Sequence, residues 1–92
     1  LYVAASRPRM LRLAGELGDG VMLSDIALPA LPATLATLRE GLALRAAPPA
    51  EFPVNNLLAW HVKHDRAAAY AEAHRKLWVR GIWERARIAP YL

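Results

Sequence analysis

The first 24 residues constrain the fold more than any other part of the chain, because they are typical of a strand, turn, helix, turn and strand. Residues 1–5 form a short apolar run, and residues 21–23 form a second one. Between them, Pro8 suits the first position of a helix, where its backbone torsion is preset and its missing N–H costs nothing. Gly18 and Gly20 then end the helix. The stretch predicts a βαβ unit, with strands at 1–5 and 21–23 that are parallel and joined by a right-handed crossover.

The predicted helix spans residues 8–17. Arg7 is its expected N-cap, because a residue before proline is pushed out of the helical region. The spacing of apolar residues predicts one buried stripe along it. The residues expected in this stripe are Met10, Leu13, Ala14 and Leu17.

The start of this helix carries an unusual charge. A helix N-terminus is electropositive and favours acidic side chains, yet this one has Arg7 and Arg9, and no acid precedes Glu16. The amides of Arg9 and Met10 lie in the first turn and so lack helical acceptors. A bound phosphate would satisfy these amides and both guanidinium groups. The alternative is that Ser6 caps the turn and both arginines point into solvent.

The middle of the chain predicts a second helix. Two prolines prevent a helix before Pro32, so residues 24–32 are expected to form a loop. Leucines repeat at spacings of four, three and four from Leu31 to Leu42, which predicts a helix over residues 32–45. Gly41 is expected to weaken it by about 1 kcal/mol relative to alanine. The side chains expected on its outer face are Thr34, Thr37, Arg39 and Glu40.

A third strand and helix complete the pattern. Residues 54–62 contain a third apolar stretch, and alternation near residues 57–62 predicts a strand there, parallel and adjacent to the first two and apolar on both faces. Asp65 is a suitable N-cap for a helix over residues 66–83. The whole chain therefore predicts an α/β fold with about three parallel strands and flanking helices.

Composition narrows the function classes. The net charge is +4 and the basic residues are scattered, which suits a solvated face or a phosphate-bearing cofactor as well as nucleic acid. The absence of cysteine excludes disulfides and suits a cytoplasmic location. No apolar run approaches the ~18 residues of a membrane span. His61, His64 and His74 lack the spacing of a metal site, so neither a membrane nor a metal partner is predicted.

A resemblance to a known family is carried by the following residues: Val3-Ala4-Ala5-Ser6-x-Pro8-x-Met10-Leu11-x-Leu13-Ala14-Gly15-Glu16-Leu17-Gly18-Asp19-Gly20-Val21. This segment resembles the luciferase-like monooxygenase superfamily, and most closely its branch that uses the deazaflavin coenzyme F-420, which includes methylenetetrahydromethanopterin reductase. The likeness continues through residues 56–66 and the helix that follows. It implies a (β/α)8 TIM barrel, which needs about 250 residues. Residues 1–92 are then expected to be a single partial domain, the C-terminal portion of that barrel.

The resemblance implies an oxidoreductase, a monooxygenase or reductase, that binds FMN or coenzyme F-420. In the family, the turn after this strand holds the cofactor phosphate by its backbone amides. The family usually has glycine where Arg7 stands, although an arginine can compensate by its charge. For Ser24 the alternative role is that of a turn serine. The cofactor-binding residues implied are Ala5, Ser6, Arg7, Arg9, Met10 and Ser24.

No catalytic side chain is predicted within these residues, because in this superfamily the cofactor carries out the redox chemistry. The expected partner is a small-molecule substrate, without nucleic acid, and a homodimer is one assembly open to the full-length enzyme. The isolated chain is expected to be inactive and to unfold with low cooperativity, because both outer strands lack neighbours. The competing hypothesis is a small basic αβ interaction or nucleic-acid-binding module without enzyme activity. The sequence leaves open the choice between FMN and F-420 and the identity of the substrate.

Overall fold

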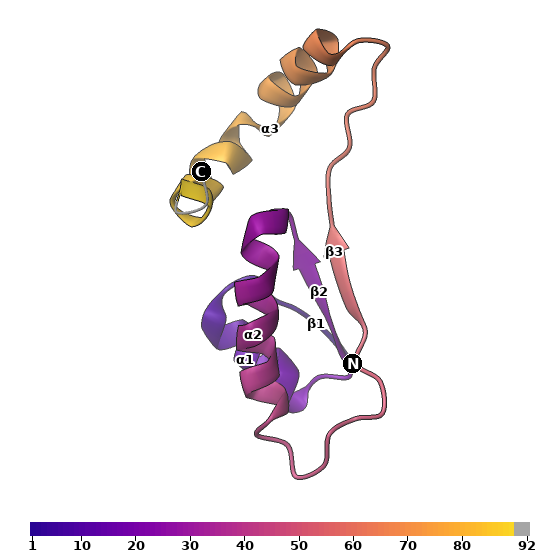
Figure 1. The fold of residues 1–92 in the computed structure, drawn as a ribbon, viewed down its shortest axis with the longest axis vertical. Helices are drawn as coiled ribbons and strands as arrows, with labels where there is room; N and C mark the ends of the chain where they lie inside the picture. The colour runs from indigo at the N-terminus through magenta and orange to yellow at the C-terminus, as the bar shows by residue number, and fades with distance from the viewer. Residues whose placement is uncertain (90–92) are drawn as a thin grey trace. The chain divides into compact units, whose positions relative to one another are not determined.

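The computed structural model describes residues 1–89, with side chains described for residues 1–76, 85 and 89. The chain forms two compact units, Leu1–Leu58 and Ala59–Leu92. Its elements are shown in Figure 1 and are, in chain order, β1 (Tyr2–Ala4), α1 (Pro8–Leu17), β2 (Gly20–Ser24), the short 3-10 helix η1 (Leu28–Ala30), α2 (Leu31–Leu42), β3 (Val54–Leu57) and α3 (Arg66–Ile88). All but α3 belong to the first unit.

The three strands form one parallel sheet in the order β1-β2-β3, as the sequence predicts. The register places Val3 beside Val21 and Val21 beside Val54. Each strand lies next to the one that follows it in the chain, and helix α1 connects β1 to β2. The α/β class is thereby confirmed, and the arrangement is consistent with part of a (β/α)8 barrel.

The third strand, β3, spans Val54–Leu57 and so begins where the apolar stretch of residues 54–62 begins, but the placement of the strand near residues 57–62 is wrong. Its ladder ends where β2 ends, at the pair formed by Ser24 and Leu57. The side chains of Trp60 and Val62 beyond it are 80% and 84% exposed. Alternating apolar residues mark a segment that can form a strand, but the length of the neighbouring strand decides how much of it is paired.

One face of the sheet packs against α1 and α2, and the core lies between them (Figure 1). Val21 and Leu23 of β2 point into this core and are fully buried, together with Ile26 just beyond the strand. The alternate residues of β1 and β2, including Tyr2 and Met22, lie on the other face and are exposed. The sheet of the first unit is thus covered on one side by its own helices.

Helix α1 has the predicted bounds, but a different face is buried. Leu11, Ala14 and Gly15 are buried, whereas Leu13 and Leu17 of the predicted stripe are 41% and 66% exposed. The apolar spacing fits either face, since the two differ by a rotation of one residue. The face with small residues is buried because α1 packs closely against α2.

Two glycines make this close helix crossing possible. A Cβ atom added to Gly15 would lie 2.5 Å from the carbonyl oxygen of Leu38 and 2.8 Å from the amide nitrogen of Leu42. A Cβ atom added to Gly41 would likewise clash with the backbone of Arg12. The expectation that Gly41 only weakens its helix is therefore wrong, because the glycine lets the two backbones meet.

Helix α2 begins one residue before the predicted start and ends three residues before the predicted end. Its leucine stripe is confirmed, with Leu38 buried and Leu31, Leu35 and Leu42 partly buried against the core. Thr34 was expected on the outer face but is buried, and its hydroxyl donates to the carbonyl oxygen of Ala30 at 3.0 Å. That bond satisfies the hydroxyl and makes its burial tolerable.

In the second unit, Asp65 is the N-cap of α3, as predicted: its carboxylate accepts a hydrogen bond from the Ala68 amide at 2.7 Å. The helix continues to Ile88, five residues beyond the predicted end. Within the described part of the chain, no helix has both the length and the apolar character needed to cross a membrane.

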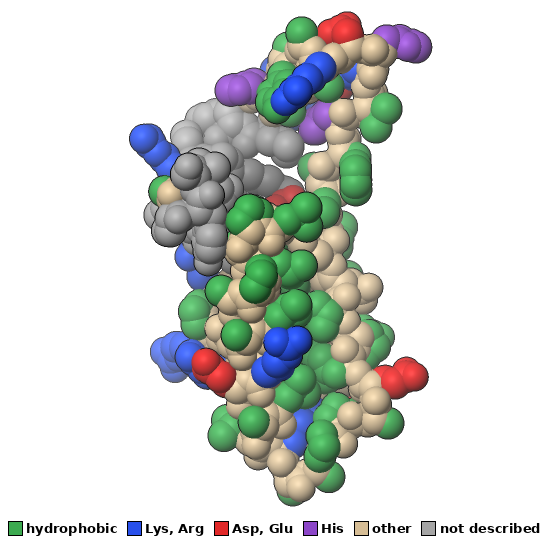
Figure 2. Space-filling view, viewed as in Figure 1, with side chains coloured by type: hydrophobic (Ala, Val, Ile, Leu, Met, Phe, Trp, Pro, Cys, Tyr) green, Lys and Arg blue, Asp and Glu red, His purple; other side chains and the backbone are tan. Residues whose placement is uncertain are grey.

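Several large apolar side chains of the first unit face solvent, and Figure 2 shows them on the surface. The most exposed of them are Leu1, Leu17, Leu28 and Leu44. Exposed apolar edges were expected for a sheet of this kind.

Candidate functional site

A hollow of about 230 Å³ lies at the carboxyl ends of β1 and β2. Its walls come from three segments: the end of β1, the turn into α1 with the first turn of that helix, and alternate residues of β2. The lining residues are Ala4, Ala5, Ser6, Arg7, Met10, Met22 and Ser24. Because it lies at the carboxyl edge of parallel strands, the hollow has the position in which α/β folds bind ligands.

The turn between β1 and α1 forms one wall of the hollow. The Ala5 amide donates to the Met22 carbonyl oxygen at 3.1 Å, which extends the pairing of β1 with β2 by one residue. Arg7 then adopts an extended backbone with φ −108° and is the N-cap of α1, as predicted. The Leu11 amide donates to the Arg7 carbonyl oxygen at 2.9 Å and makes the first bond of the helix.

The amides that precede this bond, those of Arg9 and Met10, have no acceptor within the helix. No side chain caps α1, so Ser6 does not cap it, and the first turn contains no acidic residue. The electropositive end of the helix and the cationic residue Arg7 therefore border the hollow. A bound anion would complement both charges.

The end of β2 forms the opposite wall. Ser24 is the last residue of the strand and lies on the same sheet face as Met22. Its hydroxyl donates to a carboxylate oxygen of Asp25 at 3.4 Å. Asp25 has a positive φ of 53°, a conformation that aspartate tolerates better than most residues, so the chain leaves the sheet directly after Ser24.

A side chain from β3 holds the chain where it leaves β2. The Ile26 amide donates to Asn56 Oδ1 at 3.2 Å, and Asn56 Nδ2 donates to the Ile26 carbonyl oxygen at 2.9 Å. The Ile26 side chain is almost completely buried in the core. The turn that follows Ser24 is thus fixed both by packing and by two hydrogen bonds.

The structure brings five of the six predicted cofactor-binding residues to this hollow: Ala5, Ser6, Arg7, Met10 and Ser24. The sixth, Arg9, is exposed and is not among the lining residues. Sequence reasoning missed Met22 as a lining residue, although alternation along a strand places it on the same face as Ser24. It also missed the support that Asn56 gives to the turn, for which the available signal was a pair of asparagines, Asn55 and Asn56, inside a predicted strand.

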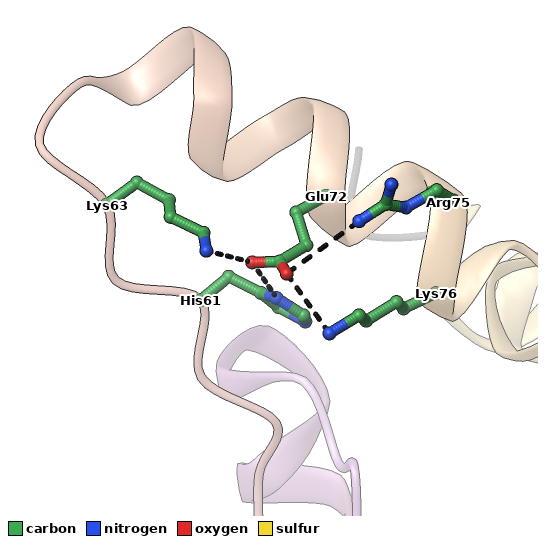
Figure 3. A network of polar contacts seen from close by, with 5 residues as sticks. All are labelled: His61, Lys63, Glu72, Arg75 and Lys76. Carbon is green, nitrogen blue, oxygen red and sulfur yellow. Dashed lines mark ion pairs between the residues drawn. The ribbon is translucent and has the colours of Figure 1, made fainter.

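In the second unit, Glu72 of α3 is surrounded by basic side chains (Figure 3). Its carboxylate lies 3.0 Å from the amino groups of both Lys63 and Lys76, 3.5 Å from His61 Nδ1 and 3.9 Å from the Arg75 guanidinium. Hydrogen bonds from Lys63 and Lys76 lower the pKa of Glu72 to about 2. This cluster ties the segment before α3 to the helix, and the sequence did not reveal it.

No group of three or more histidine, cysteine or carboxylate side chains that could hold a metal ion occurs among the residues that the structure describes.

A family model described as luciferase-like monooxygenase matches residues 1–90. No curated protein and no solved structure gives a significant match. The family match covers all of the hollow and nearly all of the chain.

Proposed function

The chain belongs to the luciferase-like monooxygenase family of flavin-type oxidoreductases, and from that premise we propose that its hollow binds the terminal phosphate of FMN or of coenzyme F-420. The observation that carries the proposal is the uncapped N-terminus of α1, which faces the hollow beside Arg7 with no acid in its first turn. Helix N-termini of this kind bind phosphate through their free amides and their dipole.

The size and lining of the hollow support the same assignment. Its volume of about 230 Å³ is below the ~300–1,000 Å³ of sites that enclose a whole ligand. It therefore suits the phosphate and the first atoms attached to it, while the rest of a cofactor extends beyond it. Ala4 and Ala5 are small and allow close approach, and Met10 and Met22 offer an apolar wall.

Each group has a defined task in this proposal. The amides of Arg9 and Met10 donate to phosphate oxygens, and the Arg7 guanidinium neutralises the phosphate charge. Hydrogen bonds to a charged group are worth ~1.5–3 kcal/mol each. Ser24 offers a hydroxyl on the opposite wall. When bound, the cofactor supplies two-electron chemistry, and these residues hold and orient it.

The proposal is tested by replacing both arginines in the full-length enzyme, with Arg7→Ala/Arg9→Ala, and titrating FMN and F-420 by fluorescence at fixed salt. Affinity for the cofactor that binds is expected to fall at least about tenfold, since a single charge-assisted bond already accounts for that factor. The matched control is Arg39→Ala/Arg85→Ala, which removes two exposed arginines elsewhere and is expected to leave affinity unchanged. Equal affinity of parent and test variant would place the arginines in solvent. Failure of the parent to bind either cofactor would favour an interaction module without enzyme activity.

A further inference from the structure

We propose that Asn56 is a positioning residue for the cofactor site: its side-chain amide fixes the turn after β2 and thereby holds Ser24 at the wall of the hollow. The inference rests on the proposed function, because it treats the hollow as the cofactor site. It concerns a residue that is not among the lining residues of the hollow and that bonds the backbone of Ile26, two residues after Ser24.

Backbone pairing cannot by itself hold the turn that follows β2. The ladder between β2 and β3 ends with Ser24 beside Leu57, followed by one more bond from the Asp25 amide to the Leu57 carbonyl oxygen at 2.7 Å. The positive φ of Asp25 then turns the chain away from β3. The Ile26 backbone is left with the Asn56 side chain as its partner across the two strands.

The contact between residue 56 and the Ile26 backbone needs an amide side chain. Asn56 accepts from the Ile26 amide and donates to the Ile26 carbonyl oxygen, so it uses both kinds of group at once. An aspartate in its place has no donor and sets a carboxylate against a carbonyl oxygen. A leucine has neither group and leaves both backbone atoms of Ile26 without these partners.

Packing does not explain why residue 56 is an asparagine. Asn56 is paired in register with Leu23, on the helix-facing side of the sheet, where Val21 and Leu23 are buried. Apolar and β-branched residues suit such a position, and an amide there is tolerated only when it is hydrogen-bonded. The asparagine instead fixes the backbone at the point where the chain leaves β2. Ser24 is thus held between its pairing with Leu57 and the hydrogen bonds that Asn56 makes with Ile26, two residues further on.

The test combines Asn56→Asp with Ser24→Ala and measures the affinity of the full-length enzyme for FMN and for F-420. Ala46→Asp is the charge control, because it introduces the same charge on an exposed residue after α2 that does not line the hollow. Asn56→Asp is expected to weaken binding of the cofactor that the parent binds by about fivefold, a coupling typical of neighbouring residues. Ala46→Asp is expected to stay within about twofold, as for surface substitutions.

The decisive measurement is the coupling between the two substitutions, that is, the effect of Ser24→Ala in the parent compared with its effect in the Asn56→Asp variant. Ser24→Ala is expected to weaken binding in the parent and to have little further effect in the Asn56→Asp background, since Ser24 is then no longer held in place. An Asn56 that matters only for folding would leave the effect of Ser24→Ala the same in both backgrounds, and that result overturns the inference while the proposed function stands. Parent chain that binds neither cofactor overturns both.

A milder variant covers the case in which Asn56→Asp does not fold. Asn56→Val adds no charge, suits a strand and has neither a donor nor an acceptor in its side chain. It is expected to show the same loss of coupling with Ser24→Ala. Affinity equal to that of the parent, with an undiminished effect of Ser24→Ala, contradicts the inference.

Discussion

The guanidinium of Arg45 donates to the carbonyl oxygen of Gly18 at 2.7 Å, and the same nitrogen donates to the Gly15 oxygen at 3.0 Å. Both acceptors lie at the C-terminal end of α1, where carbonyl groups lack helical donors. The negative end of the helix dipole also favours a cation at this place. A residue from beyond α2 therefore completes the end of α1 and ties the two helices together.

Removing this contact is expected to destabilise the first unit. Arg45→Ala should lower the free energy of unfolding by about 1–2 kcal/mol, because two carbonyl groups lose a charged donor. Urea unfolding followed by circular dichroism measures the change. Arg39→Ala removes an exposed arginine of α2 and serves as the control. Equal midpoints for the two variants would show that the Arg45 contact contributes nothing.

The close crossing of α1 and α2 makes a second prediction. Gly15→Ala places a Cβ atom against the Leu38 carbonyl oxygen and should cost about 1–3 kcal/mol by overpacking. At an unconstrained helix position the same change gains about 1 kcal/mol, so the sign of the effect is diagnostic. Glu16→Ala, on the exposed neighbouring residue, is the control for helix propensity. A stabilised Gly15→Ala would mean that the two helix backbones do not meet at Gly15.

The two arginines at the start of α1 should differ in importance. Arg7 lines the hollow, whereas Arg9 is exposed and lies outside its lining. Arg7→Ala alone is therefore expected to account for most of the loss in cofactor affinity, about tenfold for one charge-assisted bond. Arg9→Ala should cost no more than about twofold, since its amide is retained. Fluorescence titration of each single variant decides this, and a larger effect of Arg9→Ala would contradict the assignment of the hollow.

The Glu72 cluster predicts a specific response to acid. The pKa of Glu72 is lowered from 4.5 to about 2, first by hydrogen bonds from Lys63 and Lys76. A carboxylate whose pKa is lower in the folded state adds stability at neutral pH, and that stability is lost as pH falls from about 4.5 to about 2. An NMR titration of the Glu72 carboxyl carbon should give this low midpoint. Lys63→Ala/Lys76→Ala should move the midpoint back towards its ordinary value, and an unchanged midpoint would show that the two lysines do not cause the lowered pKa.

Local signals predicted the elements whose ends are marked by proline, glycine or a capping residue. Pro8 and Gly18 delimit α1, and Asp65 starts α3 at the predicted residue. The third strand was misplaced because its pairing depends on where β2 ends, which is a property of a distant segment. The buried face of α1 was misassigned because the closeness of the crossing at Gly15 is set by both helices and not by the periodicity of one.

The candidate site, like the fold, was predictable from the sequence only where its residues lie close together in the chain. The turn at residues 5–10 was identifiable because proline, two arginines and the absence of acid all lie within one short stretch. The contribution of Met22 required the strand register, and that of Asn56 required knowledge that the Ile26 backbone lies within hydrogen-bonding distance of its side chain. Lys63 precedes the N-cap Asp65 and Glu72 follows it in α3, so their ion pair depends on how the chain enters the helix. The spacing of these residues in the sequence does not predict the pair.

The alternation along β2 sets a limit on how related sequences can diverge. Val21 and Leu23 face the helices, whereas Met22 and Ser24 face the hollow. A one-residue insertion inside the strand would exchange these two sets and place a hydroxyl in the core and a leucine at the site. Insertions and deletions among related chains should therefore fall outside this strand, in connections such as the proline-containing segment after α2, where length can vary without altering the faces of the sheet.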